Sequence, residues 1–506
     1  MEIFLSAVLG ELASRSINLL ISRRSARPTA LDVGDSLQSA LLRAQVIVDE
    51  AMGRHIANQA MLQQLDMLRD AMHRACYVLD TSRCQSHDEE DAEDQVVNHS
   101  LSLQKLTSLK GISFASNRKT PPLLEQLQES LQNLSSMILD ARELVVFFRS
   151  YPPRLYSQPY SMHLLLGNCM FGFQMETELV INFLLHAEPP PGSEELDVLP
   201  IIGPSKVGKT TLVAHVCRNQ RVRDHFSGIL LLHDHDFADD GDDDISTTFG
   251  QRCATKLQLR MPDSNKDGRL LVVVDLVGDL GEAAWNVLYS TCKQRSMASR
   301  SKIILTSRSD KIVKFGTRPA LRLSYVSSEA FWYFFKTITF GSTDPKVHPR
   351  LLHLAMDIAK MLDRSLIGAN ITACLLRENF DVHYWSKVRT FLRGLVQKHI
   401  SKFGVHPAHL LEQDRPLQVG RMATTLEDLV FFYECQRSSQ EEVPEMRFQD
   451  VMYGNVKAVG KFKALGWRSQ IPPYYSYVIS CQIIGQETAR ATKRKRSVRN
   501  RTNSFA

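Results

Sequence analysis

A glycine-bounded loop follows a short apolar run near the middle of the chain. The run ends at Ile202, and the loop reads Gly-Pro-Ser-Lys-Val-Gly-Lys-Thr-Thr over residues 203–211. This spacing fits the pattern in which backbone N–H groups surround a phosphate chain while a lysine and a hydroxyl contact the phosphates and Mg²⁺. It predicts a buried parallel strand, a phosphate-binding loop and a helix from Leu212 to Cys217 whose positive end faces the phosphates.

Each position of this loop has an expected role. Lys209 is expected to contact the β- and γ-phosphates, and Thr210 to offer its hydroxyl to Mg²⁺. The glycines are expected to allow backbone angles that other residues avoid. A turn that binds no phosphate is the alternative, which the strand–loop–helix context disfavours. The predicted phosphate contacts are Gly203, Val207, Gly208, Lys209, Thr210 and Thr211.

Two further apolar runs end in charged residues. The first, Leu270–Val274, is followed by Asp275, and the second, Lys302–Ser307, is followed by Arg308. In parallel α/β folds, ligands bind at the carboxyl ends of the strands. Asp275 is therefore a candidate Mg²⁺ residue together with Thr210. Arg308 either contacts a γ-phosphate or is a surface arginine at a strand end.

Together these segments resemble the nucleotide-binding module of NB-ARC proteins, which are plant intracellular immune receptors and related signalling ATPases. The resemblance implies ADP or ATP with Mg²⁺ as ligands, and it places adenine against the backbone of Phe171 and Gly172. The N-terminal region is similar to the helical domain of the coiled-coil class, and no leucine-rich repeat pattern is present. Further similar segments are Leu65–Asp70, Tyr77–Asp80, Arg221–Phe226 and Ser328–Phe340.

The sequence departs from the family pattern at three places. The family has two adjacent acids at the end of the Asp275 strand, and here the second is Leu276. The second acid is thought to orient the attacking water, so we expect ATP hydrolysis to be weak or absent. The Gly-Leu-Pro-Leu stretch falls at 362–369 with Leu366 in place of proline, which alters the expected adenine pocket. A Met-His-Asp triplet does not occur after residue 400.

Composition excludes several other classes of protein. The chain has 506 residues, of which 43% are hydrophobic, but it contains no apolar stretch of about 20 residues that would span a membrane. Nine cysteines without a C-x-x-C pair argue against a disulfide framework and a zinc site, and favour a reducing compartment, the cytoplasm or the nucleus. The six basic residues of the tail Lys493–Arg501 account for the net charge of +6. The rest is balanced, so no broad nucleic-acid surface is expected; the tail is either a nuclear-import signal or a solvated end.

Patterns along the chain predict a multidomain protein of the α and α/β classes. Heptad spacing from Leu124 to Phe148 indicates packing within a bundle, with an intermolecular coiled coil as the alternative. The expected parts are a helical bundle (1–150), a linker with the adenine-contact segment (151–194), a P-loop NTPase parallel α/β domain (195–325), a small helical lid domain (326–410), a C-terminal segment with short strands (411–492) and a basic tail (493–506).

We therefore expect an ADP- or ATP-binding molecular switch in plant defence signalling that is at most a weak ATPase. Its protein partners would bind through the N-terminal helical domain, by self-association or with a full-length immune receptor. The alternative is a non-switching interaction or decoy protein in which nucleotide mainly stabilises the fold. A phosphoryl-transfer enzyme is the third interpretation, but it needs a group that orients the nucleophile, and the sequence offers none.

Overall fold

The computed structural model describes residues 29–52, 54, 56, 58–95, 123–141, 144–146, 170–186, 196–233, 269–295, 301–413, 415–420, 427–437, 443–453, 460–469, 471 and 474–485. The chain divides into two compact units, one made of Met1–Ile56 and Ala60–Tyr156 and the other of Ala57–Gln59 and Ser157–Ala506. The predicted basic tail, 493–506, lies outside the described residues. Within the described ranges, no helix is both long enough and apolar enough to cross a membrane.

The first unit is helical, as predicted. Its described helices are α2 (Ala30–Met52), α3 (Gln59–Gln95) and α4 (Leu123–Asp140). The Thr29 hydroxyl accepts from the Asp32 N–H at 3.2 Å and so caps α2. Helix α2 packs against α4, in which Leu127 and Leu134 are fully buried. The heptad leucines therefore pack within the unit, and α4 ends at Asp140, before the predicted end of the pattern at Phe148.

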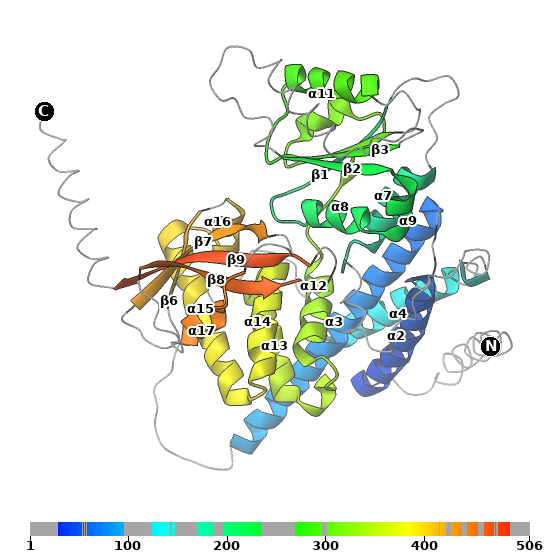
Figure 1. Cartoon of the computed structure of the whole chain (residues 1–506). Coiled ribbons are helices and arrows are strands. Elements are labelled where there is room, and N and C mark those ends of the chain that lie inside the picture. The colour runs from blue at the N-terminus through cyan, green and yellow to red at the C-terminus, as the bar shows by residue number, and fades with distance from the viewer. Residues whose placement is uncertain are drawn as a thin grey trace, which may run out of the picture. The chain divides into compact units, whose positions relative to one another are not determined.

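A five-stranded parallel sheet forms the core of the nucleotide-binding region in the second unit (Figure 1). The spatial order of its strands is β2-β3-β4-β1-β5. Strands β1 and β4 are buried along their whole length, which explains their nearly continuous apolar sequences. In chain order the strands are β1 (Asp197–Ile202), β2 (Gly228–His233), β3 (Leu270–Asp275), β4 (Lys302–Ser307) and β5 (Leu321–Arg322).

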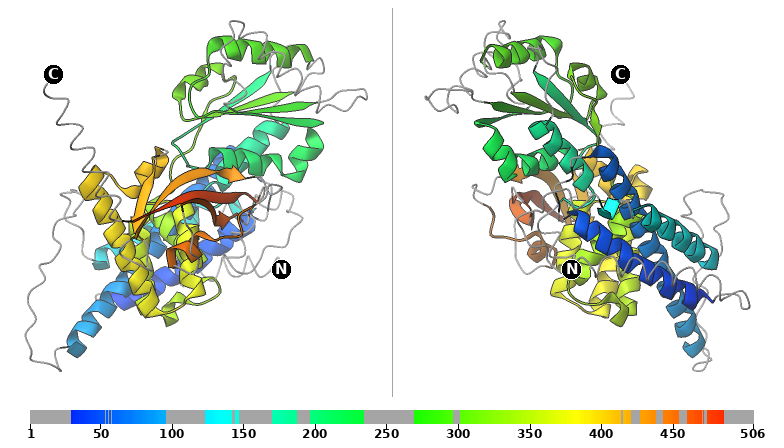
Figure 2. Two further views of the ribbon diagram at one scale, coloured as in Figure 1. Left: turned by 60° about the vertical axis from the view of Figure 1, so that its left-hand side comes forward. Right: turned by 90° about the vertical axis from the view of Figure 1, so that its right-hand side faces the viewer.

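Helices cover both faces of this sheet (Figure 2). One face carries α7 (Gln174–His186), α8 (Lys209–Cys217) and α9 (Gln220–His225). The other carries α11 (Glu282–Arg295) and the short helix η2 (Asp310–Phe315). The predicted parallel α/β domain is confirmed. The prediction of a linker over 151–194 is wrong for α7, which buries Val180, Ile181 and Leu184 in the core.

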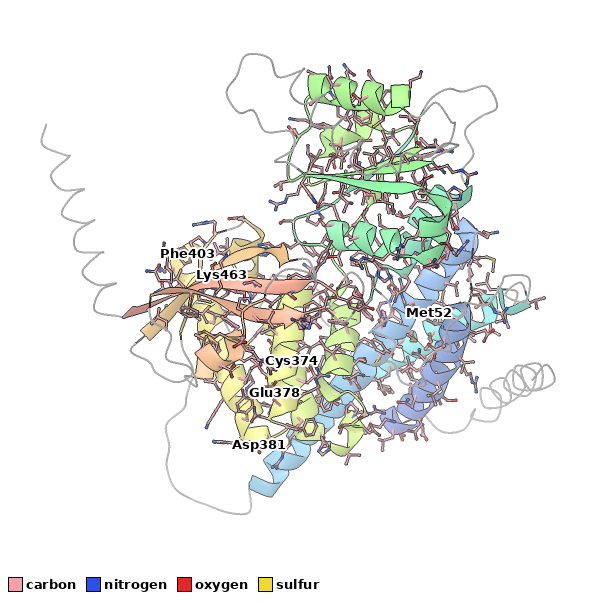
Figure 3. The ribbon with its side chains drawn as sticks, viewed as in Figure 1. Met52, Cys374, Glu378, Asp381, Phe403 and Lys463 are labelled. Atoms are coloured by element: carbon pink, nitrogen blue, oxygen red, sulfur yellow. The ribbon has the colours of Figure 1, made fainter. Side chains whose placement is uncertain are left out.

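A helical region follows the parallel sheet. Trp385, near the start of α15, is fully buried, and its ring N–H lies 2.9 Å from the Leu376 carbonyl and 3.0 Å from that of Asn379. Figure 3 shows the chain passing along α14 at Cys374 and Glu378, turning at Asp381 and returning along α15 to Phe403. The helices are α12 (Ser328–Phe340), η3 (Pro345–Val347), α13 (Pro349–Met361), α14 (Leu366–Glu378), α15 (Val382–Phe403) and α16 (Pro407–Glu412).

The C-terminal segment forms a four-stranded antiparallel sheet in the order β6-β7-β9-β8. The sequence predicted short strands in this segment, but β7 has 11 residues and β9 has 10. The elements are β6 (Leu417–Gly420), β7 (Glu427–Arg437), α17 (Phe448–Tyr453), β8 (Lys461–Arg468) and β9 (Ser476–Gly485).

Candidate functional site

The loop between β1 and α8 needs both of its glycines, for different reasons. A Cβ atom at Gly203 would lie 2.5 Å from the carbonyl oxygen of Leu323. The Leu323 N–H donates to the Ile202 carbonyl at 2.8 Å, so that neighbour cannot move away freely. Gly208 has φ +110°, in the left-handed region that favours glycine. Close packing, rather than the backbone freedom that we expected, is the reason for glycine at 203.

The start of α8 directs backbone N–H groups toward this loop. Its N-cap residue is Gly208, which has no side chain to bond the amides of the first turn, where Thr210 and Thr211 lie. The Ser205 hydroxyl oxygen is buried in the same loop and has no hydrogen-bond partner in the described part of the chain. An anion at a helix N-terminus satisfies such groups, so the loop fits a phosphate.

Lys209 places its ammonium inside the loop. Its side chain is buried, and Nζ donates to the Gly203 carbonyl at 2.7 Å and to the Pro204 carbonyl at 2.8 Å. The pKa of Lys209 is lowered to about 8, first by burial and then by the positive charge of Arg308, while the Asp275 carboxylate opposes both effects. A bound phosphate that replaces the loop carbonyls as the partner of the ammonium would stabilise the charged form of Lys209 and raise its pKa.

Asp275 connects β3 to the helix that follows the loop. Its carboxylate accepts from the Thr210 hydroxyl at 2.9 Å and from the Thr306 hydroxyl, and His233 Nδ1 lies 3.9 Å away. The described residues contain no cluster of three His, Cys, Asp or Glu that could hold a metal ion. Mg²⁺ keeps several waters and takes few carboxylates, so Asp275 and Thr210 fit this ion when phosphate oxygens complete its ligands.

Leu276, which follows β3, and Arg308, which follows β4, lie in different environments. Leu276, in the position of the family's second acid, is 4% exposed and belongs to the core cluster with Leu280 and Trp285 beneath α11. Arg308 is exposed at the end of β4, and its charge acts on Lys209. The structure therefore brings Arg308 to the phosphate loop and directs Leu276 into the core.

Phe171 and Gly172 form a turn before α7. The Phe171 ring is buried against α12, with centroids 6.2 Å from Tyr333 and 5.1 Å from Phe334. Gly172 has φ +79°, and a Cβ there would lie 2.5 Å from a methyl carbon of Val326. The predicted role of this turn in binding adenine thus depends on its backbone, because the ring is used in packing.

A cavity of about 230 Å³ lies between the loop, the helical region and the C-terminal sheet. Lys206 and Val207 line it from the loop, residues 361–368 from the helical region, and Tyr477 and Ile479 from β9. Most of its lining side chains are apolar, which suits a flat base or another apolar group. The loop thus contributes Lys206 and Val207 to the cavity, whereas the predicted phosphate, metal and adenine residues other than Val207 do not line it.

Sequence reasoning missed a histidine at this cavity. His406, which lines the cavity, donates from Nε2 to the Met361 carbonyl at 3.1 Å and accepts at Nδ1 from the Ala408 N–H at 3.2 Å. Burial, as the largest cause, lowers its pKa, while Asp363 at 3.7 Å opposes the shift. These bonds define a neutral imidazole that joins the end of α13 to the start of α16. A motif search could not find His406, because the residues next to it do not form the Met-His-Asp triplet.

The turn between β8 and β9 also reaches the nucleotide-binding region. Ile471 packs against the core cluster that contains Val207 and Leu212. Within the turn, the Ser469 N–H donates to the Tyr475 carbonyl at 2.8 Å. Burial and then the Asp275 carboxylate raise the pKa of the Tyr475 hydroxyl, which places that phenol near the predicted metal residue. Sequence reasoning found no motif in this segment.

The NB-ARC domain model matches residues 174–344. The chain contains an NB-ARC domain. The match runs from α7 through the phosphate loop, Asp275 and Arg308 to the end of α12, so it includes the parallel sheet and the phosphate site described above. The resemblance predicted from these residues is confirmed.

Several plant disease resistance proteins are similar to parts of this chain. The disease resistance protein RGA2 of Solanum bulbocastanum is 26% identical over 229 residues, covering 44% of this chain and 23% of that protein. The putative disease resistance protein RGA1 of the same species is 25% identical over 228 residues, with the same coverage. The putative disease resistance RPP13-like protein 1 of Arabidopsis thaliana is 23% identical over 410 residues, covering 76% of this chain and 36% of that protein. The chain thus matches only a minor part of each relative's length.

We expect the affinity of the NB-ARC domain for ADP to fall as the pH rises through about 8. The pKa of Lys209 is about 8 without ligand, and a bound phosphate would raise it. Binding then takes up a proton above that pH, so affinity is full below it and falls by up to about tenfold per pH unit above it. Calorimetric titration across this range measures the slope. The side chain of Lys209→Arg stays positively charged across this pH range, so its ADP affinity should not change with pH. An equal pH dependence in both proteins would show that another group causes it.

Proposed function

We propose that this chain is an ADP- or ATP-binding switch in plant defence signalling, with weak or absent ATP hydrolysis. The observation that carries the proposal is the buried Lys209 ammonium on the loop carbonyls, next to the Thr210–Asp275 pair. The similarity to plant disease resistance proteins supports the signalling context. ADP or ATP, with Mg²⁺ at Thr210 and Asp275, is the proposed ligand.

The shape of the cavity supports a switch. Its lining comes from the phosphate loop, the turn at 361–368 and the C-terminal sheet, so one ligand would touch several elements at once. A ligand shifts a conformational equilibrium only when it binds the two states with different affinity. Arg308, exposed beside Lys209, is the residue that we propose responds to a γ-phosphate.

Weak hydrolysis follows from the surroundings of the phosphate loop. Leu276 is buried in the core at the position where a second acid would be needed to orient water. Phosphoryl transfer depends on a group that positions the nucleophile. We therefore expect ATP turnover far below about 1 per second, the low end for kinases.

Identification of the nucleotide carried by the purified protein tests this function. The protein is purified without added nucleotide and denatured, and the released small molecules are identified by mass spectrometry. ADP or ATP close to one per chain is the expected result. An empty protein that also fails to bind millimolar ADP would exclude the proposed function.

A non-switching interaction or decoy protein that pairs with a full-length receptor is the second candidate. The burial of Leu276 favours it, since a site without hydrolysis can serve stability alone. Exchange kinetics separate the two: a switch should exchange bound ADP for added ATP and change the protection of its amides at 361–368. A structural nucleotide should do neither.

Replacing Asp275 by asparagine is expected to remove the effect of Mg²⁺ on ATP binding. The amide keeps the shape of the side chain but loses the charge that would hold the ion, so the affinity in Mg²⁺ should fall by about tenfold to the value in EDTA. Asp279→Asn, which changes an exposed acid paired with Lys311, is the matched control. A Mg²⁺ effect that persists in the Asp275 variant would place the ion elsewhere.

Partners and location complete the proposal. We place protein contacts on the N-terminal helical unit, through self-association or binding to a full-length receptor. The cytoplasm is the proposed compartment, with nuclear entry depending on the Lys493–Arg501 tail. Deleting that tail and imaging the protein in plant cells tests this point, because an unchanged distribution would leave the tail a solvated end.

A further inference from the structure

Tyr325 joins the phosphate loop to the segment that leads into α12. Its hydroxyl donates to the Ser205 carbonyl at 2.9 Å. The ring packs against the core cluster of α7 and α8 and also lines the cavity. A hydrogen bond to the loop and the packing of its half-buried ring thus both hold Tyr325 in place.

Arg364 lies on this ring. The guanidinium carbon is 5.7 Å from the Tyr325 ring centroid, within the range of a cation–π contact. In the described part of the chain, Arg364 forms no ion pair with a carboxylate. It lines the same cavity as Lys206 of the phosphate loop. An arginine without a carboxylate partner, placed beside an anion-binding loop, is available for an anionic ligand.

The backbone that carries Arg364 is strained. Asp363 has φ 45° and Arg364 has φ 60°, so two consecutive non-glycine residues adopt the left-handed region that favours glycine. The turn is held by its neighbours: the Ser365 hydroxyl caps α14 by accepting from the Gly368 N–H at 3.1 Å. The Asp363 carboxylate lies 3.5 Å from His409 Nε2. Strain of this kind persists where surrounding contacts enforce it, and it is concentrated at ligand sites.

We propose that Arg364, seated on Tyr325, binds a phosphate oxygen of the nucleotide from the side of the α13–α14 turn. The contact would make the site select nucleoside diphosphates and triphosphates over nucleosides. It would also make the position of that turn depend on the bound phosphates. This inference rests on the proposed nucleotide-binding function and assigns to it a residue outside the NB-ARC match, which ends at residue 344.

The test compares ADP with adenosine, which lacks phosphates, by calorimetry on the full chain. Arg364→Ala should weaken ADP binding by about 10- to 100-fold and leave adenosine binding unchanged. Arg364→Gly should do the same while keeping or raising the thermal midpoint, because glycine adopts positive φ without strain. Tyr325→Phe keeps the ring but removes the bond to Ser205, so we expect a smaller loss of about fivefold for ADP.

Arg377→Ala is the matched control, because this exposed arginine lies on α14 outside the cavity. The variant should bind ADP and adenosine as the unmodified chain does. Equal losses of ADP and adenosine affinity in Arg364→Gly would show a purely structural role and overturn the inference. Unchanged ADP affinity in that variant would also overturn it, while the proposed function would stand because the unmodified chain still binds ADP. Failure of the unmodified chain to bind ADP would remove both.

Discussion

Replacing Lys209 by alanine is expected to weaken ADP binding by about 100-fold. The side chain is 8% exposed, and its ammonium is held by the Gly203 and Pro204 carbonyls at the position where a phosphate chain would enter. Removing it leaves the phosphates without this charge in a partly desolvated loop. Calorimetry with ADP measures the loss.

The stability of the ligand-free protein separates loss of binding from loss of fold. Burial disfavours the charged form of Lys209, as its lowered pKa shows, so alanine should leave the thermal midpoint of the free protein nearly unchanged. Lys311→Ala removes an exposed lysine from the same domain and should keep full affinity. An unchanged ADP affinity in the Lys209 variant would contradict the phosphate site itself.

Replacing Leu276 by aspartate is expected to lower the free energy of unfolding by about 3–5 kcal/mol. The residue is 4% exposed in the cluster with Leu280 and Trp285, so the new carboxylate would be buried among apolar side chains. Restoring the acid of the family pattern would therefore destabilise the domain before it could orient water. Urea unfolding measures the effect.

The neighbouring residue provides the control. Val277 is 55% exposed, and Val277→Asp introduces the same charge one position later with little expected change in stability. If Leu276→Asp were as stable as the unmodified chain and hydrolysed ATP faster, its side chain would face the phosphates, and the missing acid alone would explain the weak turnover.

Consecutive residues made the phosphate loop predictable. Gly203, Gly208 and Lys209 follow a fixed spacing, and Asp275 stands at the end of an apolar run that marks a strand. The structure confirms the strand, loop and helix at these positions, because the end of a parallel strand is set locally by where burial stops, and the phosphate and metal contacts stay predictions.

Tertiary packing made the remaining residues of the site unpredictable. Tyr325, Arg364 and His406 come together around the cavity from segments far apart in the sequence, and each is typical of an ordinary surface or core position. Aspartate adopts positive φ more readily than most residues, but Arg364 does not favour it, so the sequence did not reveal two consecutive left-handed positions. Helix α7 was missed because prolines flank it and its apolar residues lie on all sides, without a helical period.

The turn between β8 and β9 has a consequence for how this chain can be divided. Ile471 packs on the core of the parallel sheet, and Tyr475 lies within reach of the charge on Asp275, although both follow the NB-ARC match by more than a hundred residues. A fragment cut at the end of that match would expose apolar side chains that this turn now covers. In this chain, the set of residues that covers the core of the parallel sheet extends beyond the segment that the family model matches.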